Sequence, residues 1–466
     1  MESTTTSTST KTIQRFASLD FQRGLAIILM TLLHGFSDFY DSSWLQNDYS
    51  QILAWPIPVI IIFVGISFLA IWNAYFLLIS TIVNSISMSR KMRNGINPNN
   101  VLLKQMINGF GIIFAGFIKD VIGYGGYIGT AIQTGDWTDT FPLWEGFFAM
   151  HTLQIIGWSI IITSIINYFI LRKEGYRHYI RNMIIYGILT ILVICLSPLF
   201  AYLIDKIPWQ IPPEMPELSW PDNYLQAYNA SFKAWICTLI AGNMEPLFPY
   251  LATAFIGSMI GITLTEPNPI KKFPLIGGLT SLGLTIIGAI IFALSGFSFV
   301  TGRPTIGLYL VLLGAQLGSL FLLLWLIEYR GNATKFGNNR IIKHIRLWGM
   351  LSLTLYVLDI FELLPRWIAT LFHRLIFHST ADFVRHPLNY GQEYWALLMA
   401  LVILVAYGLL VWLWSKLNFV FSLEWFLIRL NSLGTKQKSK RLEVKLMMNE
   451  VHWISLKSQQ NSSANQ

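Results

Sequence analysis

The sequence predicts an all-α protein, a polytopic membrane helix bundle with about ten transmembrane helices and both termini in the cytoplasm. The first observation behind this is composition: 54% of the 466 residues are hydrophobic and only 12% are charged. Too few polar residues remain to cover the apolar surface of a water-soluble globule, so a bilayer is the expected solvent.

The second observation is a set of long apolar runs. A hydrocarbon core about 30 Å thick requires roughly 20 apolar residues per crossing, and runs of this length satisfy their own backbone hydrogen bonds as helices. The runs are residues 20–36, 52–79, 102–123, 147–170, 182–204, 234–264, 274–298, 305–328, 347–364 and 394–415. Cys195 and Cys237 both fall inside these runs and indicate neither a disulfide framework nor a metal site.

The third observation is charge. Of the Lys and Arg residues close to a span, 21 lie on one side of the predicted membrane and six on the other. The positive-inside rule therefore places both termini in the cytoplasm, in an integral membrane protein expected in the plasma membrane. The net charge of +9 is spread over short loops without a continuous patch, so no nucleic-acid partner is expected.

The chain divides by composition into a disordered polar tail (1–16), a transmembrane domain (17–430) and a polar, basic cytoplasmic tail (431–466). No cleavable signal precedes the first run. Two long connections, 124–146 and 205–233, lie on the opposite side, and the second carries a glycosylation sequon at Asn229. Their tryptophans are interpreted as interfacial anchors, with stacking against a sugar as the alternative; they are Trp137, Trp144, Trp209 and Trp220.

The first run, "LDFQRGLAIILMTLLHGFSDFYD" (19–41), carries Arg23 at its cytoplasmic edge and His34 in its outer half. Eleven positions of a helix bring both to one face, about 16 Å apart. Arg23 could instead extend to lipid phosphates. Asp38, four residues after His34, can orient the imidazole and leave its other nitrogen as a base. The alternative is a histidine capped by Asp38 where the helix leaves the bilayer.

Further polar groups fall at a similar depth in other runs, and intramembrane ionisable groups are functional candidates by default. The candidates for acceptor binding or proton handling are Asp120, Glu145, His151, Glu245 and Asp359. Lys119 and Asp120 are interpreted as the pair with the strongest case for a structural ion pair. Pro246 and Pro249 must interrupt the helix beside Glu245. Together these groups predict a polar cavity that opens outward.

Several segments resemble membrane acyltransferases. "RGLAIILMTLLH" has the Arg-x10-His spacing of the acyltransferase-3 family, and "SLDFQRGLAIILMTLLH" is similar to the first helix of the heparan-α-glucosaminide N-acetyltransferase family. Further similar segments keep the family order: "PVIIIFVGISFLAI" (58–71), "MHTLQIIGW" (150–158), "PLFPYLATAFIGSMIG" (246–261), "WGMLSLTLYVLDIF" (348–361) and "SLEWFLIRL" (422–430). One departure is the connection "GFSDFYDSSWLQNDYS", which lacks a histidine found there in heparan acetyltransferases, so the catalytic role would pass to His34.

The resemblance implies transfer of an acyl group, usually acetyl from cytosolic acyl-CoA, to an extracytoplasmic acceptor such as a glycan. Arg23 and the basic loops would bind the CoA phosphates, and no metal is expected. His34 would act as general base or transient acyl carrier, oriented by Asp38. A proton-coupled secondary transporter with its site around Glu245 is the rival hypothesis, because broken helices with intramembrane acids are typical of transport sites. The oligomeric state stays open.

Overall fold

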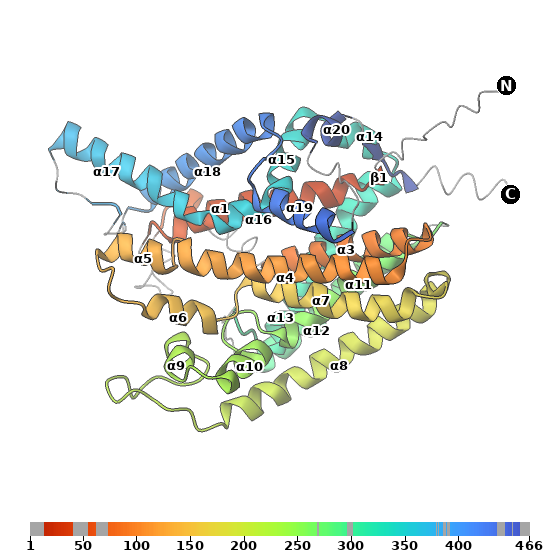
Figure 1. The fold of residues 1–466 in the computed structure, drawn as a ribbon, viewed down its shortest axis with the longest axis horizontal. Helices are drawn as coiled ribbons and strands as arrows, with labels where there is room; N and C mark the ends of the chain where they lie inside the picture. The colour runs from red at the N-terminus through yellow and green to blue at the C-terminus, as the bar shows by residue number, and fades with distance from the viewer. Residues whose placement is uncertain are drawn as a thin grey trace.

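The computed structural model describes residues 14–40, 55–61, 73–267, 270–295, 302–378, 380, 382–384, 388, 392–435, 443–449 and 451–456. These residues form an all-α bundle whose long helices run side by side in alternating directions (Figure 1). One minimal parallel strand pair joins β1 (Gln14–Arg15) to β2 (His452–Trp453), with Gln14 opposite His452. The two ends of the described chain therefore meet at one end of the bundle.

The helices follow in chain order. The first half contains α1 (Ala17–Ser37), α3 (Asn73–Arg93), α4 (Pro98–Ile122), α5 (Tyr127–Thr134), α6 (Phe141–Phe148), α7 (Thr152–Leu171), η3 (Gly175–Arg177), α8 (Tyr179–Asp205), α9 (Asn223–Tyr228), α10 (Phe232–Ala241) and α11 (Leu247–Thr263). The second half contains α12 (Phe273–Leu294), α13 (Ile306–Leu324), η4 (Trp325–Tyr329), α14 (Ala333–Gly337), α15 (Arg340–Met350), α16 (Ser352–Val357), η5 (Asp359–Glu362), α17 (Leu363–Phe377), α18 (Glu393–Lys416), α19 (Leu423–Thr435) and α20 (Val444–Asn449).

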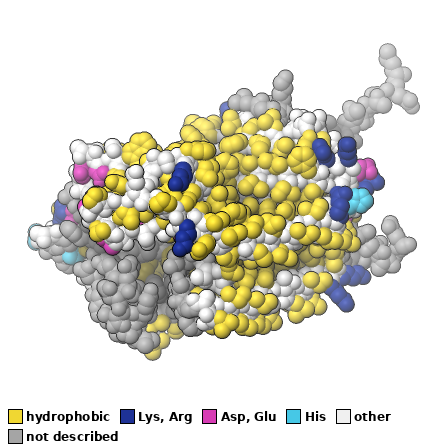
Figure 2. Space-filling model, turned by 90° about the horizontal axis from the view of Figure 1, so that it is seen from below, with side chains coloured by type: hydrophobic (Ala, Val, Ile, Leu, Met, Phe, Trp, Pro, Cys, Tyr) yellow, Lys and Arg dark blue, Asp and Glu magenta, His cyan; other side chains and the backbone are white. Residues whose placement is uncertain are grey.

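Six helical stretches in the described part of the chain are long and apolar enough to cross a bilayer. They are Pro98–Thr134, Phe141–Leu171, Tyr179–Asp205, Phe273–Leu294, Ile306–Tyr329 and Glu393–Lys416. Hydrophobic side chains cover most of the visible face, and Lys and Arg gather at the end where β1 and α14 lie (Figure 2). The predicted class is confirmed: these features indicate an integral membrane protein.

Several boundaries differ from the ten predicted runs. Run 52–79 lies partly outside the described residues, and the helix described there, α3, continues to Arg93 through part of a predicted cytoplasmic loop. Run 234–264 is two helices, α10 and α11, separated by a break that contains Glu245 and Pro246. Run 347–364 is divided among α15, α16, η5 and α17. Each interrupted segment has polar groups or proline at the break, where the helical hydrogen-bond ladder cannot continue unaided.

Helix α1 is continuous, and neighbouring elements hold it closely. A Cβ at Gly24 would lie 1.9 Å from the carbonyl oxygen of Ile345 in α15, so the two backbones meet there without a side chain between them. The first turn of α1 is capped from outside, because the Ser18 N–H donates to Glu328 Oε1 at 2.9 Å. These contacts fix where Arg23, the residue before Gly24, projects into the bundle.

Candidate functional site

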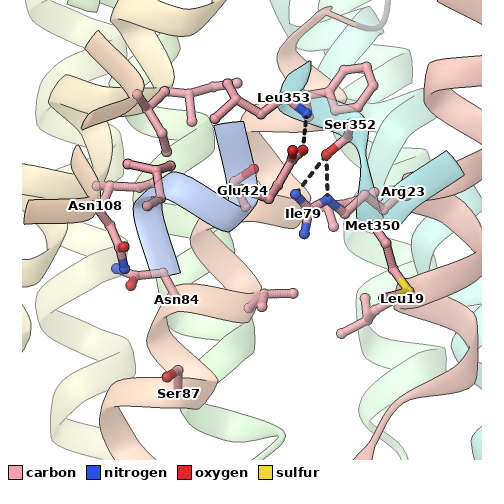
Figure 3. Close-up of a pocket in the computed structure, with 18 of the residues that line it drawn as sticks. Leu19, Arg23, Ile79, Asn84, Ser87, Asn108, Met350, Ser352, Leu353 and Glu424 are labelled. Atoms are coloured by element: carbon pink, nitrogen blue, oxygen red, sulfur yellow. Dashed lines mark hydrogen bonds between the residues drawn. The ribbon is translucent and has the colours of Figure 1, made fainter. Parts of the chain in front are cut away.

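An internal cavity of about 250 Å³ lies between α1, α3, α4, α7, α15, α16 and α19. Figure 3 shows side chains from several of these helices, including Arg23, Asn84 and Asn108, around the open space. Its walls come from both halves of the chain, so the cavity exists only in the folded bundle. Helix α19, although it follows the last predicted span, contributes Glu424, Leu427, Ile428 and Asn431 to the wall.

The longest wall is one face of α3. The residues from α3 that line the cavity are Phe76, Ile79, Ser80, Val83, Asn84, Ser87 and Lys91. They recur at three- and four-residue spacing, which keeps them on one face of the helix. Phe76 and Lys91 lie about 22 Å apart along the helix axis at a rise of roughly 1.5 Å per residue. The cavity is therefore long and narrow, and its length is most of a hydrocarbon thickness of about 30 Å.

One end of the cavity is basic. Arg15, Lys91, Lys104 and Arg346 all line it near the end of the bundle where β1 lies. Arg346 lies 3.7 Å from Asp20 and 4.3 Å from the ring of Trp453. Burial lowers the pKa of Arg346 to about 10, against the opposing effect of Asp20, so the side chain stays charged at neutral pH. This end suits an anionic ligand.

Arg23 lies in the cavity wall and does not extend to lipid. Its Nε and Nη2 donate to Ser352 Oγ at 3.0 and 2.6 Å. The Glu424 carboxylate lies beside this pair and accepts from the Leu353 N–H at 2.7 Å, as Figure 3 shows. The alternative in which Arg23 reaches lipid phosphates is therefore wrong for this structure. The guanidinium is held at a fixed position in the wall of the cavity.

Thr152 and Tyr356, whose side chains hydrogen-bond to each other, line the other end of the cavity. Directly behind them, Lys119 Nζ lies 5.2 Å from the centroid of the Tyr356 ring. The same lysine pairs with Asp359 at 3.1 Å. Beyond Tyr356, at the end of the bundle opposite the basic end, lies a group of charged or ionisable side chains, here named the outer group: Lys119, Asp120, His151 and Asp359.

The outer group brings together several of the predicted candidates. Asp120 accepts from Gln154 Nε2 at 3.2 Å and lies 3.6 Å from His151 Nε2. Asp359 pairs with Lys119, as described, so the interpretation of Lys119 with Asp120 as an ion pair is wrong. Adjacent helical residues point in different directions, which leaves Asp120 facing α7 and Lys119 facing η5.

Tyr124 connects the outer group to the end of α1. Its backbone N–H donates to Asp359 Oδ1 at 2.9 Å, and its hydroxyl donates to the Asp38 carbonyl at 3.2 Å. The same hydroxyl accepts from Arg366 Nη1 at 2.8 Å. The Arg366 side chain is only 1% exposed. A tyrosine from the α4–α5 turn thereby holds α1, η5 and α17 together around a buried guanidinium.

His34 and Asp38 lie on the outer part of the α1 face that carries Arg23. His34 Nδ1 is 3.9 Å from Asp38 Oδ2, which is beyond hydrogen-bond distance, and the His34 side chain is 46% exposed. His34 is outside the cavity lining. In this structure Asp38 lies beside His34 without a hydrogen bond to it, and about half of the imidazole is uncovered by protein.

Two predicted candidates lie elsewhere. Glu145, in α6, hydrogen-bonds to Asn223 of α9. Glu245 lies in the break between α10 and α11, is 5% exposed, and its backbone N–H donates to the Gly302 carbonyl at 2.8 Å. Its carboxylate is close enough to Tyr356 for the charge to act on that hydroxyl. The interruption expected beside Glu245 is confirmed.

The tryptophans of the two long connections, 124–146 and 205–233, differ in their surroundings. Trp209 and Trp220 stack on each other, with ring centroids 4.2 Å apart, while Trp137 and Trp144 are each more than half exposed. A sugar can therefore stack only on the second pair without rearrangement. Both hydrogens of the Asn229 amide are used, by the carbonyls of Gln210 and Leu225, so the folded sequon is poorly suited to glycosylation.

The residues of the candidate site that sequence reasoning missed are Ser80, Asn84, Ser87, Tyr124, Arg366 and Glu424. A polar stripe at helical spacing in "LISTIVNSISMSRK" could have indicated the first three. No comparable signal marks Arg366 or Glu424, because their partners are distant in sequence. Within the described ranges, no group of three His, Cys, Asp or Glu side chains could hold a metal ion.

The chain is thus an α-helical integral membrane protein with a long internal cavity, basic at one end and bounded by charged groups at the other. No protein-family model matches the sequence. A search of curated proteins also finds no match.

Proposed function

We propose that this protein is an integral membrane acyltransferase that moves an acyl group, in the simplest case acetyl, from cytosolic acyl-CoA to an extracytoplasmic acceptor such as a glycan. The observation that carries the proposal is the shape and charge of the cavity. It runs about 22 Å along α3, from Lys91 among other basic residues to Phe76, and Tyr356 lines the end next to the outer group.

Acyl-CoA matches this cavity in two respects. Its phosphates are multiply anionic and would bind the basic end formed by Arg15, Lys91, Lys104 and Arg346. Its long, slender pantetheine arm can follow the polar stripe of α3 past Arg23. The thioester then arrives at Tyr356, next to the group that includes Asp359 and Tyr124. This polarity requires the basic end to face the cytoplasm, in agreement with the positive-inside rule.

In this reaction His34 is the general base. The imidazole removes the proton from the acceptor hydroxyl or amine, whose oxygen or nitrogen forms a bond to the thioester carbon. The C–S bond then breaks, and the CoA thiolate leaves and is protonated. Asp38 orients the imidazole and stabilises its cationic form. His34 remains accessible for an acceptor that enters from the extracytoplasmic side, since its side chain is 46% exposed.

The second candidate function is proton-coupled transport, and the break at Glu245 favours it. A buried carboxylate between two half-helices, 5% exposed, is a common arrangement for a coupling site. The cavity would then be the substrate path. Transport requires no thioester chemistry, so the two functions are separable by experiment.

The test uses purified protein in liposomes with acetyl-CoA labelled in its acetyl group. Acyl transfer predicts label in an added glycan acceptor and release of free CoA, both lost in His34→Ala. His344→Ala is the matched control, because His344 is an exposed histidine of α15 that does not line the cavity. Uptake driven by an imposed pH gradient without CoA release, abolished by Glu245→Gln, would instead establish the transporter and overturn the acyltransferase.

A further inference from the structure

The Arg366 guanidinium is buried with unused donors. Its Nη1 donates to Tyr124, whereas Nε and Nη2 have no hydrogen-bond partner among the residues that the structure describes. The side chain is 1% exposed. A buried donor without a partner is costly, and such groups in native structures call for an explanation such as catalysis or a bound molecule.

The position of this guanidinium is fixed. Its Cζ lies 4.6 Å from the ring centroid of Tyr124 and 5.1 Å from that of Phe39, so two aromatic faces hold it. The Tyr124 hydroxyl fixes one terminal nitrogen. The N–H groups on Nε and Nη2 therefore have fixed directions before any ligand arrives. Electrostatic stabilisation of a transition state requires donors that are preorganised in this way.

Two nearby carboxylates balance the charge of Arg366 but do not accept hydrogen bonds from Nε or Nη2. The carboxylates of Asp38 and Glu362 are near enough for their charges to interact with the guanidinium. In the described part of the chain neither forms an ion pair with it. A permanently anionic ligand would be repelled by the two carboxylates. A neutral carbonyl oxygen that gains negative charge only during reaction suits donors placed in this way.

We propose that Arg366 is a further catalytic residue: its Nε and Nη2 bind the thioester carbonyl oxygen and stabilise the oxyanion that forms there. The inference rests on the proposed acyl transfer. When the acceptor attacks the carbonyl carbon and His34 takes its proton, the carbonyl π electrons move to this oxygen. They return when the C–S bond breaks and the CoA thiolate departs. Tyr124, which also contacts Asp38, is the positioning residue for the guanidinium.

The test compares two CoA analogues that cannot transfer an acyl group. In the dethia analogue of acetyl-CoA a methylene replaces the sulfur and the carbonyl remains; in S-ethyl-CoA the sulfur remains and a methylene replaces the carbonyl. Binding to the full-length protein in nanodiscs is measured by calorimetry. Two charge-assisted hydrogen bonds predict that the carbonyl analogue binds roughly 10- to 100-fold more tightly.

Arg366→Lys keeps the charge but loses the pair of parallel donors, so it should bind the two analogues within about twofold of each other. It should also lower kcat/KM for acetyl transfer by roughly 10²–10³, partly through a higher KM, because the same donors already contact the carbonyl of bound acetyl-CoA. Arg374→Lys is the control on the same helix, because Arg374 is half exposed and contacts Asp382. Tyr124→Phe removes only the hydrogen bond that positions Arg366. It should partly lower both the preference for the carbonyl analogue and the rate of acetyl transfer.

Wild-type protein without preference for the carbonyl analogue would overturn the role of Arg366 even if Arg366→Lys fails to fold. So would an Arg366→Lys variant that keeps the preference and the rate. Wild-type protein that transfers no acyl group at all would instead overturn the proposed function. The two failures are distinguishable because the analogue preference and the transfer assay are separate measurements.

Discussion

Lys119 of α4 and Asp359 of η5 form an ion pair, with Nζ and Oδ2 3.1 Å apart and both side chains about one-fifth exposed. Asp359 also accepts the backbone N–H of Tyr124, and Lys119 faces the ring of Tyr356. The pair therefore lies between the end of the cavity lined by Tyr356 and the residues around Arg366. It joins the part of the bundle that would receive the thioester to the part that would receive the acceptor.

The first prediction concerns the energetics of this pair. Lys119→Met and Asp359→Asn should each lower the free energy of unfolding by about 3–5 kcal/mol, because each leaves a largely buried charge without its partner. The double variant should lose much less than the sum of the two. Denaturant unfolding in detergent, followed by tryptophan fluorescence, measures the unfolding free energy of the wild type, the two single variants and the double variant of this double-mutant cycle.

The control pair is Arg303 with Asp205, 2.9 Å apart, in which the Asp205 side chain is 44% exposed and the Arg303 side chain 14%. Arg303→Met should cost at most about 1 kcal/mol, since the carboxylate that it leaves unpaired is partly solvated. Equal losses in the two pairs, or strict additivity for Lys119 and Asp359, would contradict the argument that burial makes the inner pair important.

The second prediction tests the cavity wall on α3. Ser87→Cys, in a protein whose two cysteines are replaced by serine, should react with a membrane-impermeant thiol reagent added from the cytoplasmic side. Ser85→Cys should react at least about tenfold more slowly, because exposure controls thiol reactivity and Ser85 is fully buried against Asn167. Acetyl-CoA should protect Ser87→Cys. Reaction from the extracytoplasmic side alone would reverse the assigned orientation.

The sequence predicts a helix of this bundle well only where its hydropathy is uniform along the helix. It predicts α4, whose apolar run is continuous and whose start is marked by Asn97 and Pro98. It misplaces α3, because the polar residues that face the cavity lower the mean over the helix. Ser80, Asn84 and Ser87 line the cavity, and their polarity is what obscures the span. The prediction therefore fails at the cavity wall, where local and global preferences conflict.

For the candidate site too, the sequence predicts the local geometry but not the tertiary partners. The spacing of Arg23 and His34 predicts a shared helix face, and continuous α1 has the geometry for it. The partners of these groups could not be predicted, because Ser352 and Glu424 come from far along the chain. Asp359 was named as a candidate, but its pairing with Lys119 depends on how η5 packs against α4. Tertiary contact of this kind has no periodic signal in one sequence.

The third prediction concerns Glu424, which accepts hydrogen bonds from the backbone N–H groups of Leu353 and Thr354 at 2.7 and 3.2 Å. These belong to the first turn of α16, which has no partner for them within the helix. Glu424→Gln should cost about 1–2 kcal/mol of unfolding free energy, because a neutral amide is the weaker acceptor, and should weaken acyl-CoA binding, because the turn that carries Ser352, the partner of Arg23, is held less firmly. Glu174→Gln, at an exposed position, should change neither. Unchanged stability in Glu424→Gln would show that α19 does not close the cavity wall.

The fourth prediction concerns the glycine after Arg23. Gly24→Ala should destabilise the protein by several kcal/mol, roughly the cost of overpacking a core, because the added Cβ would lie 1.9 Å from the Ile345 carbonyl oxygen. Backbone atoms cannot move aside as a side chain can, so α1 and α15 would separate and carry Arg23 away from Ser352. Gly187→Ala is the matched control: nothing lies within 4 Å of its Cβ. That variant should be neutral or stabilised by up to about 1 kcal/mol through helix propensity. Thermal unfolding of both variants in one detergent decides the matter, and equal stability would show that α1 does not depend on this close approach.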